Sequence, residues 1–383
     1  MICRLLPAVL GAGLWIAPVG ALGGAAVAQP EQREHGEQPE LPGSLRNARV
    51  AKAMPADPGQ RAAARLTFFA GGLSAEQVAE LATVAPNVTI VTGLNRQSAL
   101  ERAAEADGID GRLVSPDLLE KAGKLVWVHS PSAGVERLVT IPGIGDRASL
   151  VVTNARGVHG PAIADHAMAM LLYLTRQIGH YEAAMEKEQW ERSEPPVRPV
   201  TLQGKTMLVV GIGGIGEEIG RRAHGFGMRV LATRRSDSPA PDFVERVGKP
   251  EELRSMVKEA DVVAICVPLT TETEQLFDAG MFEAMKRGSY VINIARGKVI
   301  DTQALLAALK DGRVAGAALD VTDPEPLPAG HALWKMPNVI ITPHVAADGE
   351  LTDQRWWALY KENMRRFGAG EPLLNCVDVK AGY

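Results

Sequence analysis

Three polar side chains in the second half of the chain have the chemistry to bind a small anion and move a proton. Arg296, Glu325 and His344 each follow an apolar stretch typical of a strand. A guanidinium can hold a carboxylate and a neighbouring carbonyl oxygen at once, and an imidazole titrates near neutrality, which suits a proton donor. Alone, such an arginine is more often a surface ion pair and such a histidine is more often structural. In this order, each beyond a strand of one domain, they predict an active site at the carboxyl ends of a parallel sheet.

A glycine-rich segment is the second chemical signature. Apolar residues 207–210 lead into Gly-x-Gly-x-x-Gly at 211–216, and a helix-like segment at 217–226 and a second apolar run at 228–232 follow. In this context the first glycine permits a tight turn, the second lets the backbone approach a pyrophosphate, and the third brings helix and strand together. The unpaired N–H groups at the helix start favour an anion, so the segment predicts dinucleotide binding. The candidate cofactor-binding residues are Gly211, Gly213, Gly214, Ile215 and Gly216.

The end of the second apolar run predicts which nicotinamide dinucleotide is preferred. NAD-specific folds place an acidic residue there to bind the ribose hydroxyls. Here Arg234 occupies that position, and Arg235 follows it. An arginine removes the repulsion against a 2′-phosphate and can pair with it, so we expect NADP(H) to be preferred over NAD(H). The alternative is that both arginines are exposed and bind no ligand.

Short strands alternating with helices must position these residues. Such alternation predicts parallel sheets with right-handed crossovers, and Ser74 is expected to cap the first helix. One long helix is expected from 160 to 190, ended by the proline-rich segment 194–199. The other expected helices are 74–84, 96–106 and a closing helix at 353–367; the strands are 66–70, 88–91, 108–110, 125–129, 261–267, 290–294, 315–319 and 339–342.

The predicted fold class is α/β, with two Rossmann-like or flavodoxin-like parallel-sheet domains. The length of 383 residues fits about two domains. Because the closing helix could return to the first domain, we expect the cofactor domain to be inserted into the substrate domain. The expected boundaries are 1–28 for a signal peptide, 29–60 for a linker or disordered arm, 61–158 with 350–383 for the substrate domain, and 159–349 for the nucleotide-binding domain.

Composition narrows the possible partners. The net charge of −4 does not suggest a nucleic-acid or anionic-membrane surface. Three cysteines without metal-ligand spacing predict neither a zinc site nor a disulfide framework. We expect no bound metal.

The first residues resemble an export signal. Arg4 precedes an apolar stretch that ends in Ala26-Val27-Ala28, a cleavage pattern before Gln29. The expectation is a periplasmic or exported enzyme whose mature form has no integral membrane domain. It would be cytoplasmic if the start codon is assigned upstream of the true one.

Several ordered motifs resemble the D-isomer-specific 2-hydroxyacid dehydrogenases. The similarity covers roughly residues 66–383. The matching text is the glycine segment 210–216, Val267-Pro268-Leu269-Thr270, Asn293-Ile294-Ala295-Arg296-Gly297, Leu319-Asp320-Val321, Pro324-Glu325-Pro326 and Thr342-Pro343-His344.

The resemblance implies a mechanism. A reduced nicotinamide gives hydride to the 2-carbon of a 2-oxo acid while His344 protonates the forming alkoxide. Arg296 would bind the carboxylate and polarise the carbonyl, and Glu325 would orient His344 and favour its protonated form.

The resemblance also implies further contacts. Ser132, Ala133 and Gly134 lie in a segment that looks like the substrate-carboxylate loop, and 154–160 resembles the interdomain hinge. Asp320 looks like the contact to the nicotinamide carboxamide. We interpret His159 and His166 as structural; Asp165-His166 stands where many relatives have a glutamate. The remaining candidate cofactor contacts are Val267, Pro268 and Ala295.

The substrate and the assembly are less constrained. Small residues in the carboxylate loop favour a small acid such as glyoxylate or hydroxypyruvate. The alternatives are a related dehydrogenase with another substrate, such as phosphite or formate, and an exported, non-catalytic cofactor-binding protein. A homodimer through the cofactor domains is expected from the resemblance and from the prevalence of two-fold symmetry.

Overall fold

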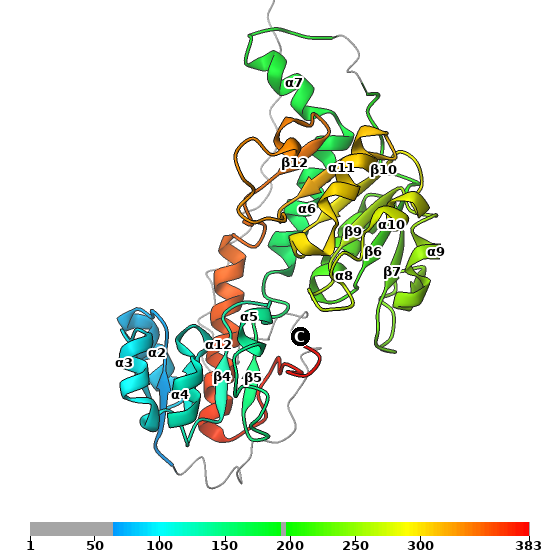
Figure 1. The fold of residues 1–383 in the computed structure, drawn as a ribbon. Coiled ribbons are helices and arrows are strands. Elements are labelled where there is room, and N and C mark those ends of the chain that lie inside the picture. Colours follow the sequence, from blue (N-terminus) through cyan, green and yellow to red (C-terminus); the bar gives the residue numbers. More distant parts are fainter. Residues whose placement is uncertain (1–63, 193–196, 383) are drawn as a thin grey trace, which may run out of the picture. The chain divides into compact units, whose positions relative to one another are not determined.

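The computed structural model describes residues 64–192 and 197–382. The predicted signal peptide (1–28) and linker (29–60) lie outside these residues, as does part of the segment 194–199. Two sheets whose strands pair in parallel, with helices around them, form this part of the chain (Figure 1). This arrangement confirms the α/β class.

The first sheet is built from strands in the order β2-β1-β3-β4-β5. Its first helix begins with the predicted cap: Ser74 Oγ accepts a hydrogen bond from the N–H of Gln77, and Oε1 of Gln77 accepts one from the N–H of Ser74. The elements are β1 (Leu66–Phe69), α2 (Ala75–Val84), β2 (Val88–Val91), α3 (Arg96–Glu101), η2 (Ala103–Glu105), β3 (Gly108–Asp110), η3 (Gly111–Leu113), α4 (Pro116–Lys121), β4 (Trp127–His129), α5 (Glu136–Val139) and β5 (Val151–Thr153).

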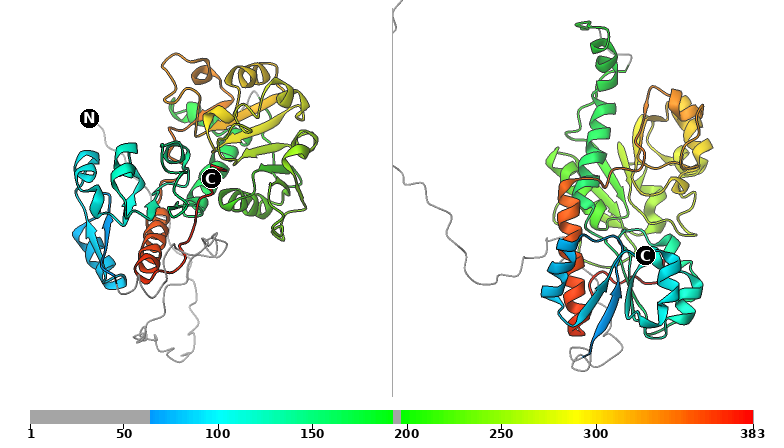
Figure 2. Two further views of the ribbon diagram at one scale, coloured as in Figure 1. Left: turned by 60° about the horizontal axis from the view of Figure 1, so that its bottom comes forward. Right: turned by 90° about the vertical axis from the view of Figure 1, so that its left-hand side faces the viewer.

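The last helix, α12 (Glu350–Ala369), follows the second sheet in the chain but packs against the first (Figure 2). An aromatic cluster joins them: the ring of Trp127 lies 4.8 Å from that of Phe68 and 5.0 Å from that of Phe367 on α12. All three side chains are buried, so the helix completes the core of this sheet.

The second sheet has seven strands in the order β12-β11-β10-β9-β6-β7-β8. Its order reverses between β6 and β9, which is where ligands of open parallel sheets bind. The elements are α6 (Gly160–Thr175), α7 (Ile178–Met185), β6 (Thr206–Val210), α8 (Gly214–Gly225), β7 (Arg229–Thr233), β8 (Arg246–Gly248), η4 (Pro250–Glu252), α9 (Leu253–Met256), β9 (Val262–Ile265), α10 (Ala279–Ala284), β10 (Ser289–Asn293), η5 (Gly297–Val299), α11 (Thr302–Lys310), β11 (Val314–Leu319), η6 (Ala332–Lys335) and β12 (Val339–Ile341).

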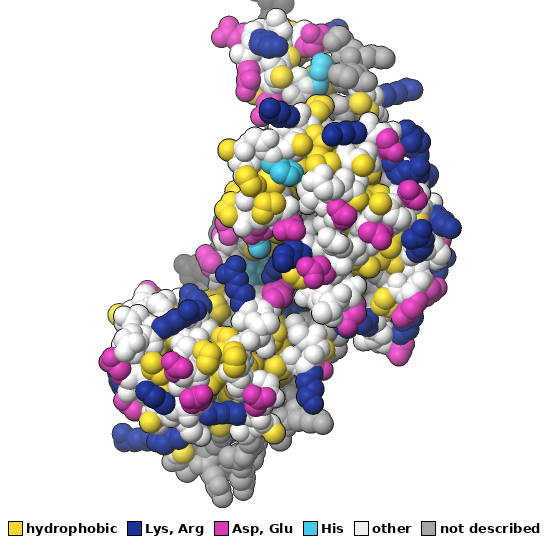
Figure 3. All heavy atoms as spheres, viewed as in Figure 1, with side chains coloured by type: hydrophobic (Ala, Val, Ile, Leu, Met, Phe, Trp, Pro, Cys, Tyr) yellow, Lys and Arg dark blue, Asp and Glu magenta, His cyan; other side chains and the backbone are white. Residues whose placement is uncertain are grey.

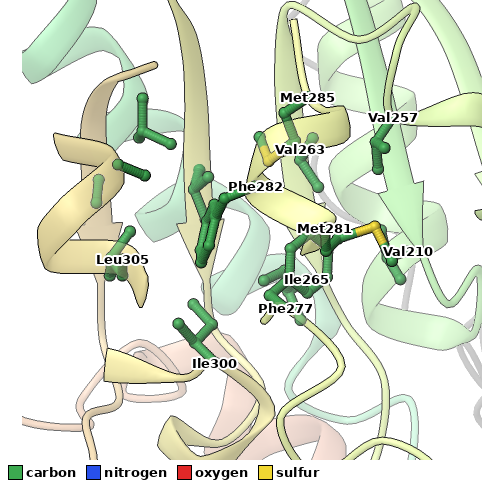
Figure 4. Packing of buried hydrophobic residues seen from close by; sticks show 14 of the residues in the cluster. Val210, Val257, Val263, Ile265, Phe277, Met281, Phe282, Met285, Ile300 and Leu305 are labelled. Atoms are coloured by element: carbon green, nitrogen blue, oxygen red, sulfur yellow. The ribbon is translucent and has the colours of Figure 1, made fainter. Parts of the chain in front are cut away.

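The core on one face of this sheet fixes the strands that lead to the candidate site. Side chains of α10 and the central strands interdigitate there, among them Phe282, Met281 and Ile265 (Figure 4). Every residue of β6, β9 and β10 is buried. Such burial on both faces is typical of a parallel sheet covered by helices, and it holds the strand ends rigidly.

The single long helix expected from 160 to 190 is wrong. The helix α6 ends at Thr175, and α7 begins at Ile178. Between them Gln177 has a left-handed backbone (φ 56°), and its side-chain amide donates to the carbonyl oxygen of Leu174. This local hydrogen bond satisfies a helix-end carbonyl and stops the helix.

The surface has no strong bias of charge on the face drawn in Figure 3, where basic and acidic side chains are intermixed. Among residues 64–192 and 197–382 no helix is both long and apolar enough to cross a membrane. The same residues contain no cluster of potential metal ligands.

Candidate functional site

The glycine turn after β6 has a backbone that other residues would strain. Gly211 has a φ of +94°, and a Cβ on it would lie 2.8 Å from Cγ1 of Val267. A Cβ on Gly216 would lie 2.5 Å from the carbonyl oxygen of Gly211. The first and third glycines of the motif are therefore required by the turn and by the approach of α8 to β6, as the sequence predicts.

The start of α8 is arranged to receive an anion. Gly213 is its N-cap, and the N–H groups of Gly214, Ile215 and Gly216 form the first turn, where intrahelical acceptors are absent. The Nη2 atom of Arg156 lies 3.3 Å from the position of a Cβ on Gly213. A pyrophosphate fits here, since backbone N–H groups can donate to it, Gly213 has no side chain in the way, and the guanidinium of Arg156 lies nearby. From the sequence, Arg156 was assigned only to a hinge segment, because nothing in residues 154–160 indicates which way its side chain points.

Basic side chains follow β7, at the ribose end of the predicted cofactor site. The guanidinium of Arg234 donates to the carbonyl oxygens of Ser238 and Pro239, while its Nε is buried without an acceptor. The Nζ of Lys249 donates to the carbonyl oxygen of Arg235 at 3.0 Å. Arg234 and Arg235 thus stand where an NAD-specific fold has a carboxylate, and the acidic residue that follows them, Asp237, is paired with Lys249.

The other predicted cofactor contacts lie after neighbouring strands. Val267 and Pro268 follow β9, and the Pro268 carbonyl oxygen accepts a hydrogen bond from Thr273 Oγ1 at 2.6 Å. The N–H of Ala295 donates to Asn293 Oδ1 at 3.0 Å, at the end of β10. Since the strands are parallel, these segments share the carboxyl edge of the sheet with the glycine turn.

His344 and Glu325 are paired directly. The Nδ1 of His344 lies 2.8 Å from Oε1 of Glu325, and both side chains are a little under half exposed. An ionised carboxylate only accepts, so the pairing places a proton on Nδ1 and leaves Nε2 to face a ligand. The loop of Glu325 is held at its start, because Thr302 Oγ1 donates to the carbonyl oxygen of Asp323 at 3.0 Å.

Asp320 organises the loop that carries His344. Its carboxylate is buried and accepts from the N–H groups of Val345 (3.0 Å) and Ala346 (3.1 Å) and from Thr342 Oγ1 (2.6 Å). Its own carbonyl oxygen accepts from the N–H of His344 at 2.8 Å. The structure therefore places Asp320 behind His344 as a support for its loop, a contact that its resemblance to a carboxamide ligand did not predict.

The remaining polar residues of α6 face other elements. Nε2 of His166 lies 2.9 Å from Thr342 Oγ1, and Asp165 accepts from Nε of Arg222 on α8 at 2.6 Å. Burial lowers the pKa of His159, which precedes the helix. His166 and Asp165 thus contact neighbouring elements, and the structural role of His159 and His166 stays a prediction.

Arg296 is anchored by its own backbone. Nη1 donates to the carbonyl oxygen of Ala295 at 2.7 Å, and Asn293 Nδ2 donates to the carbonyl oxygen of Arg296 at 3.0 Å. The other edge of the guanidinium faces Glu136, with Nη2–Oε2 and Nε–Oε1 distances of 3.3 Å. Glu136 was not predicted as a site residue, because the only indication in the sequence is its position just after the predicted substrate loop.

The predicted substrate loop lies against Arg296. A Cβ on Gly134 would collide with Nη2 of the arginine. The carbonyl oxygen of Ala133 accepts from Asn154 Nδ2 at 2.8 Å, and that of Ser132 from the N–H of Ala155 at 3.1 Å. Within the described chain the N–H groups of Ala133 and Gly134 have no acceptor. A carboxylate beside Arg296 could use them.

Comparison with known proteins agrees with this geometry. Residues 168–346 match the model of the D-isomer specific 2-hydroxyacid dehydrogenase, NAD binding domain. The chain is 33% identical over 292 residues to a glyoxylate reductase of Korarchaeum cryptofilum, which spans 74% of this chain and 86% of that protein.

Solved structures are similar over most of their length. One is a D-isomer specific 2-hydroxyacid dehydrogenase of Xanthobacter autotrophicus in complex with NADPH and MES (TM-score 0.68, 28% identity, 84% of this chain and 100% of that one). Another is an NADPH-dependent glyoxylate/hydroxypyruvate reductase of Sinorhizobium meliloti in complex with NADP and sulfate (TM-score 0.68, 27% identity, 83% and 99%).

A parallel-sheet fold with a dinucleotide turn and an arginine, glutamate and histidine at one sheet edge defines an NAD(P)-dependent dehydrogenase. The chain belongs to the D-isomer-specific 2-hydroxyacid dehydrogenase family.

Proposed function

We propose that this enzyme reduces a small 2-oxo acid, of the glyoxylate or hydroxypyruvate kind, to the D-2-hydroxy acid with NADPH. The observation that carries the proposal is the His344–Glu325 pair at 2.8 Å, which occupies Nδ1 and would leave Nε2 of the histidine to the substrate. Arg296 and the N–H groups of Ala133 and Gly134 would provide the matching anion site.

The protein groups have distinct tasks in this reaction. A bound nicotinamide would supply the hydride. The doubly protonated ring of His344 would donate its Nε2 proton to the oxygen that becomes an alkoxide, which leaves the ring neutral, and Glu325 would stabilise the positive charge that the ring carries before the transfer. Arg296 would hold the carboxylate and the carbonyl oxygen, which stabilises the negative charge that develops there.

The preference for NADPH rests on the loop after β7. Arg234 and Arg235 replace the acidic residue that would repel a 2′-phosphate, while the charge of Lys249 nearby is paired with Asp237. The relatives from Xanthobacter autotrophicus and Sinorhizobium meliloti were solved with NADPH and NADP, which supports this preference. Arg156, next to Gly213, would add a positive charge at the pyrophosphate.

Small loop residues favour a small substrate. Ala133 and Gly134 offer backbone N–H groups for a carboxylate but no side chain that could recognise a larger substrate group. The glyoxylate reductase name of the Korarchaeum cryptofilum relative supports the same substrate class.

Steady-state oxidation of NADPH and of NADH tests the proposal. The substrates offered are glyoxylate, hydroxypyruvate and larger 2-oxo acids, with phosphite and formate tested in the oxidative direction. We expect turnover of a small 2-oxo acid with a preference for NADPH. Cofactor binding without turnover of any 2-oxo acid would favour the non-catalytic alternative, and oxidation of phosphite or formate would favour the other dehydrogenases.

A further inference from the structure

Glu136 is an acidic side chain that lies beside the candidate substrate anion site. Its two oxygens face Nε and Nη2 of Arg296 at 3.3 Å. A Cβ on Gly134 would also lie 2.7 Å from Oε2 of Glu136. The carboxylate therefore stands beside the predicted loop and on the edge of the guanidinium that a substrate carboxylate would use.

The pair is loose. Charge-assisted N–H···O contacts are normally about 2.7–2.9 Å long, so 3.3 Å is a weak contact. Arg296 is 33% exposed and Glu136 28% exposed, which lets water screen the two charges.

Arg296 does not need Glu136 to hold its position. Its Nη1 already donates to the carbonyl oxygen of Ala295 at 2.7 Å. A positioning role for Glu136 is therefore the weaker explanation, and a substrate carboxylate can displace Glu136 from its edge of the guanidinium at small cost.

We infer that Glu136 is a specificity-determining residue that selects 2-oxo acids with a single negative charge. This inference rests on the proposed function and names its substrate class more narrowly. One carboxylate of a monoanionic substrate is neutralised by Arg296. A second carboxylate on the same small molecule would lie near the Glu136 oxygens, and like charges at such distances repel.

The test compares Glu136→Gln with the wild type on glyoxylate and on two diacids, oxaloacetate and 2-oxoglutarate. With Glu136→Gln, the kcat/KM for the diacids relative to glyoxylate should rise about tenfold, because the repelling charge is gone. The KM for glyoxylate should fall roughly threefold, because a weak internal competitor is gone, while kcat stays within about twofold.

Two further variants keep the test specific. Glu136→Asp retains the charge and should keep the wild-type ratio of diacid to glyoxylate. Glu120→Gln removes the same charge from an exposed position on α4 and should change nothing. A lower kcat for glyoxylate in Glu136→Gln, with an unchanged ratio, would overturn the inference in favour of a positioning role.

The same measurements separate this inference from the proposed function. Turnover of glyoxylate by the wild type supports the proposed function whatever the variants do. If the wild type turns over glyoxylate and the ratio does not move, only the role of Glu136 is wrong. If the wild type turns over no 2-oxo acid, both are wrong.

Discussion

A histidine that is nearly half exposed needs its ring fixed before it can deliver a proton in one direction. His344 has a left-handed backbone (φ 58°), a conformation that costs a non-glycine residue free energy. Hydrogen bonds from its N–H to Asp320 and from its ring to Glu325 stabilise that conformation. Because the strained backbone and the Glu325 contact act on one side chain, Nε2 has a defined direction.

His344→Gln should lower kcat for 2-oxo acid reduction by about 10²- to 10⁴-fold, since a positioned proton donor contributes that much. Glu325→Gln should lower it less, by roughly tenfold or more, because the amide oxygen can still accept from Nδ1 but no longer carries the negative charge that stabilises the protonated ring. Stopped-flow or steady-state oxidation of NADPH measures both. His224→Gln, an exposed position on α8, is the control. Equal rates in His344→Gln and the control would remove His344 from the chemistry.

The preference for NADPH over NADH can also be tested at a single residue. Arg234→Ala should lower the ratio of kcat/KM for NADPH to that for NADH by roughly 10- to 100-fold, because a charged hydrogen bond to phosphate contributes about 1.5–3 kcal/mol. The ratio matters more than either value, since Arg234 also orders the loop through Ser238 and Pro239. Arg221→Ala removes an exposed arginine from α8 for comparison. An unchanged ratio in Arg234→Ala would contradict a phosphate contact.

Helices and strands that depend on local sequence patterns were predicted well. The alternation of strand and helix, the Ser74 cap and the glycine turn need only local hydrophobicity, hydrogen bonding and backbone freedom. The break at Gln177 was missed because a left-handed glutamine has no distinct sequence signal. The edge strands β5 and β8, of three residues each, were missed.

The position of a candidate site residue could be predicted where the residue closely follows a strand that the sequence indicates. Arg296 and His344 follow β10 and β12 directly, so their edge of the sheet follows from topology. The pairing of Arg296 with Glu136 joins residues 160 positions apart in sequence. The support of the His344 loop by Asp320 likewise depends on register between strands. Neither is encoded locally, and only the folded chain shows them.

The close approach of α8 to β6 predicts that a larger residue at position 216 destabilises this helix and strand. Gly216→Ala should destabilise the fold by about 1–3 kcal/mol and weaken NADPH binding, because its Cβ would press on the Gly211 carbonyl oxygen at 2.5 Å. Thermal unfolding and fluorescence titration with NADPH measure the two effects. Gly225→Ala, in the same helix but with nothing within 4 Å, should be neutral or slightly stabilising. Equal Tm values for the two variants would mean that the turn relaxes.

At the scale of the whole molecule, a buried histidine couples stability to pH. Desolvation lowers the pKa of His129 to about 4, an effect that the nearby Asp110 carboxylate partly offsets. Its Nδ1 lies 3.0 Å from Thr153 Oγ1, and its Nε2 has no partner. The folded protein therefore keeps this ring neutral.

Stability should consequently fall as the pH drops from 6.5 toward 4, since only the unfolded chain then binds the proton. The contribution of His129 over this window is roughly 3 kcal/mol. His129→Asn keeps a polar atom near Thr153 but cannot be protonated. Its free energy of unfolding, measured by urea denaturation at several pH values, should have a shallower slope than that of the wild type. Parallel slopes, whatever the absolute stabilities, would show that other groups cause the acid sensitivity.

Apolar side chains on α7 bear on assembly. This helix has no buried residue; Ile178, Tyr181 and Met185 are 46%, 39% and 72% exposed, and Trp190 beyond it is 89% exposed. Ile178, Tyr181 and Met185 recur at helical spacing, and exposed apolar patches can mark protein interfaces. We propose α7 as the surface of the two-fold dimer that the sequence predicts.

Light scattering after size exclusion should give twice the chain mass for the wild type. The double variant Ile178→Lys with Met185→Lys should give the monomer mass, because burying two ammonium groups in an apolar interface opposes association. Phe226→Lys, which places the same charge on an exposed aromatic after α8, should remain a dimer. A monomeric wild type would leave the apolar face of α7 without a second copy, and a dimeric double variant would move the interface to another surface.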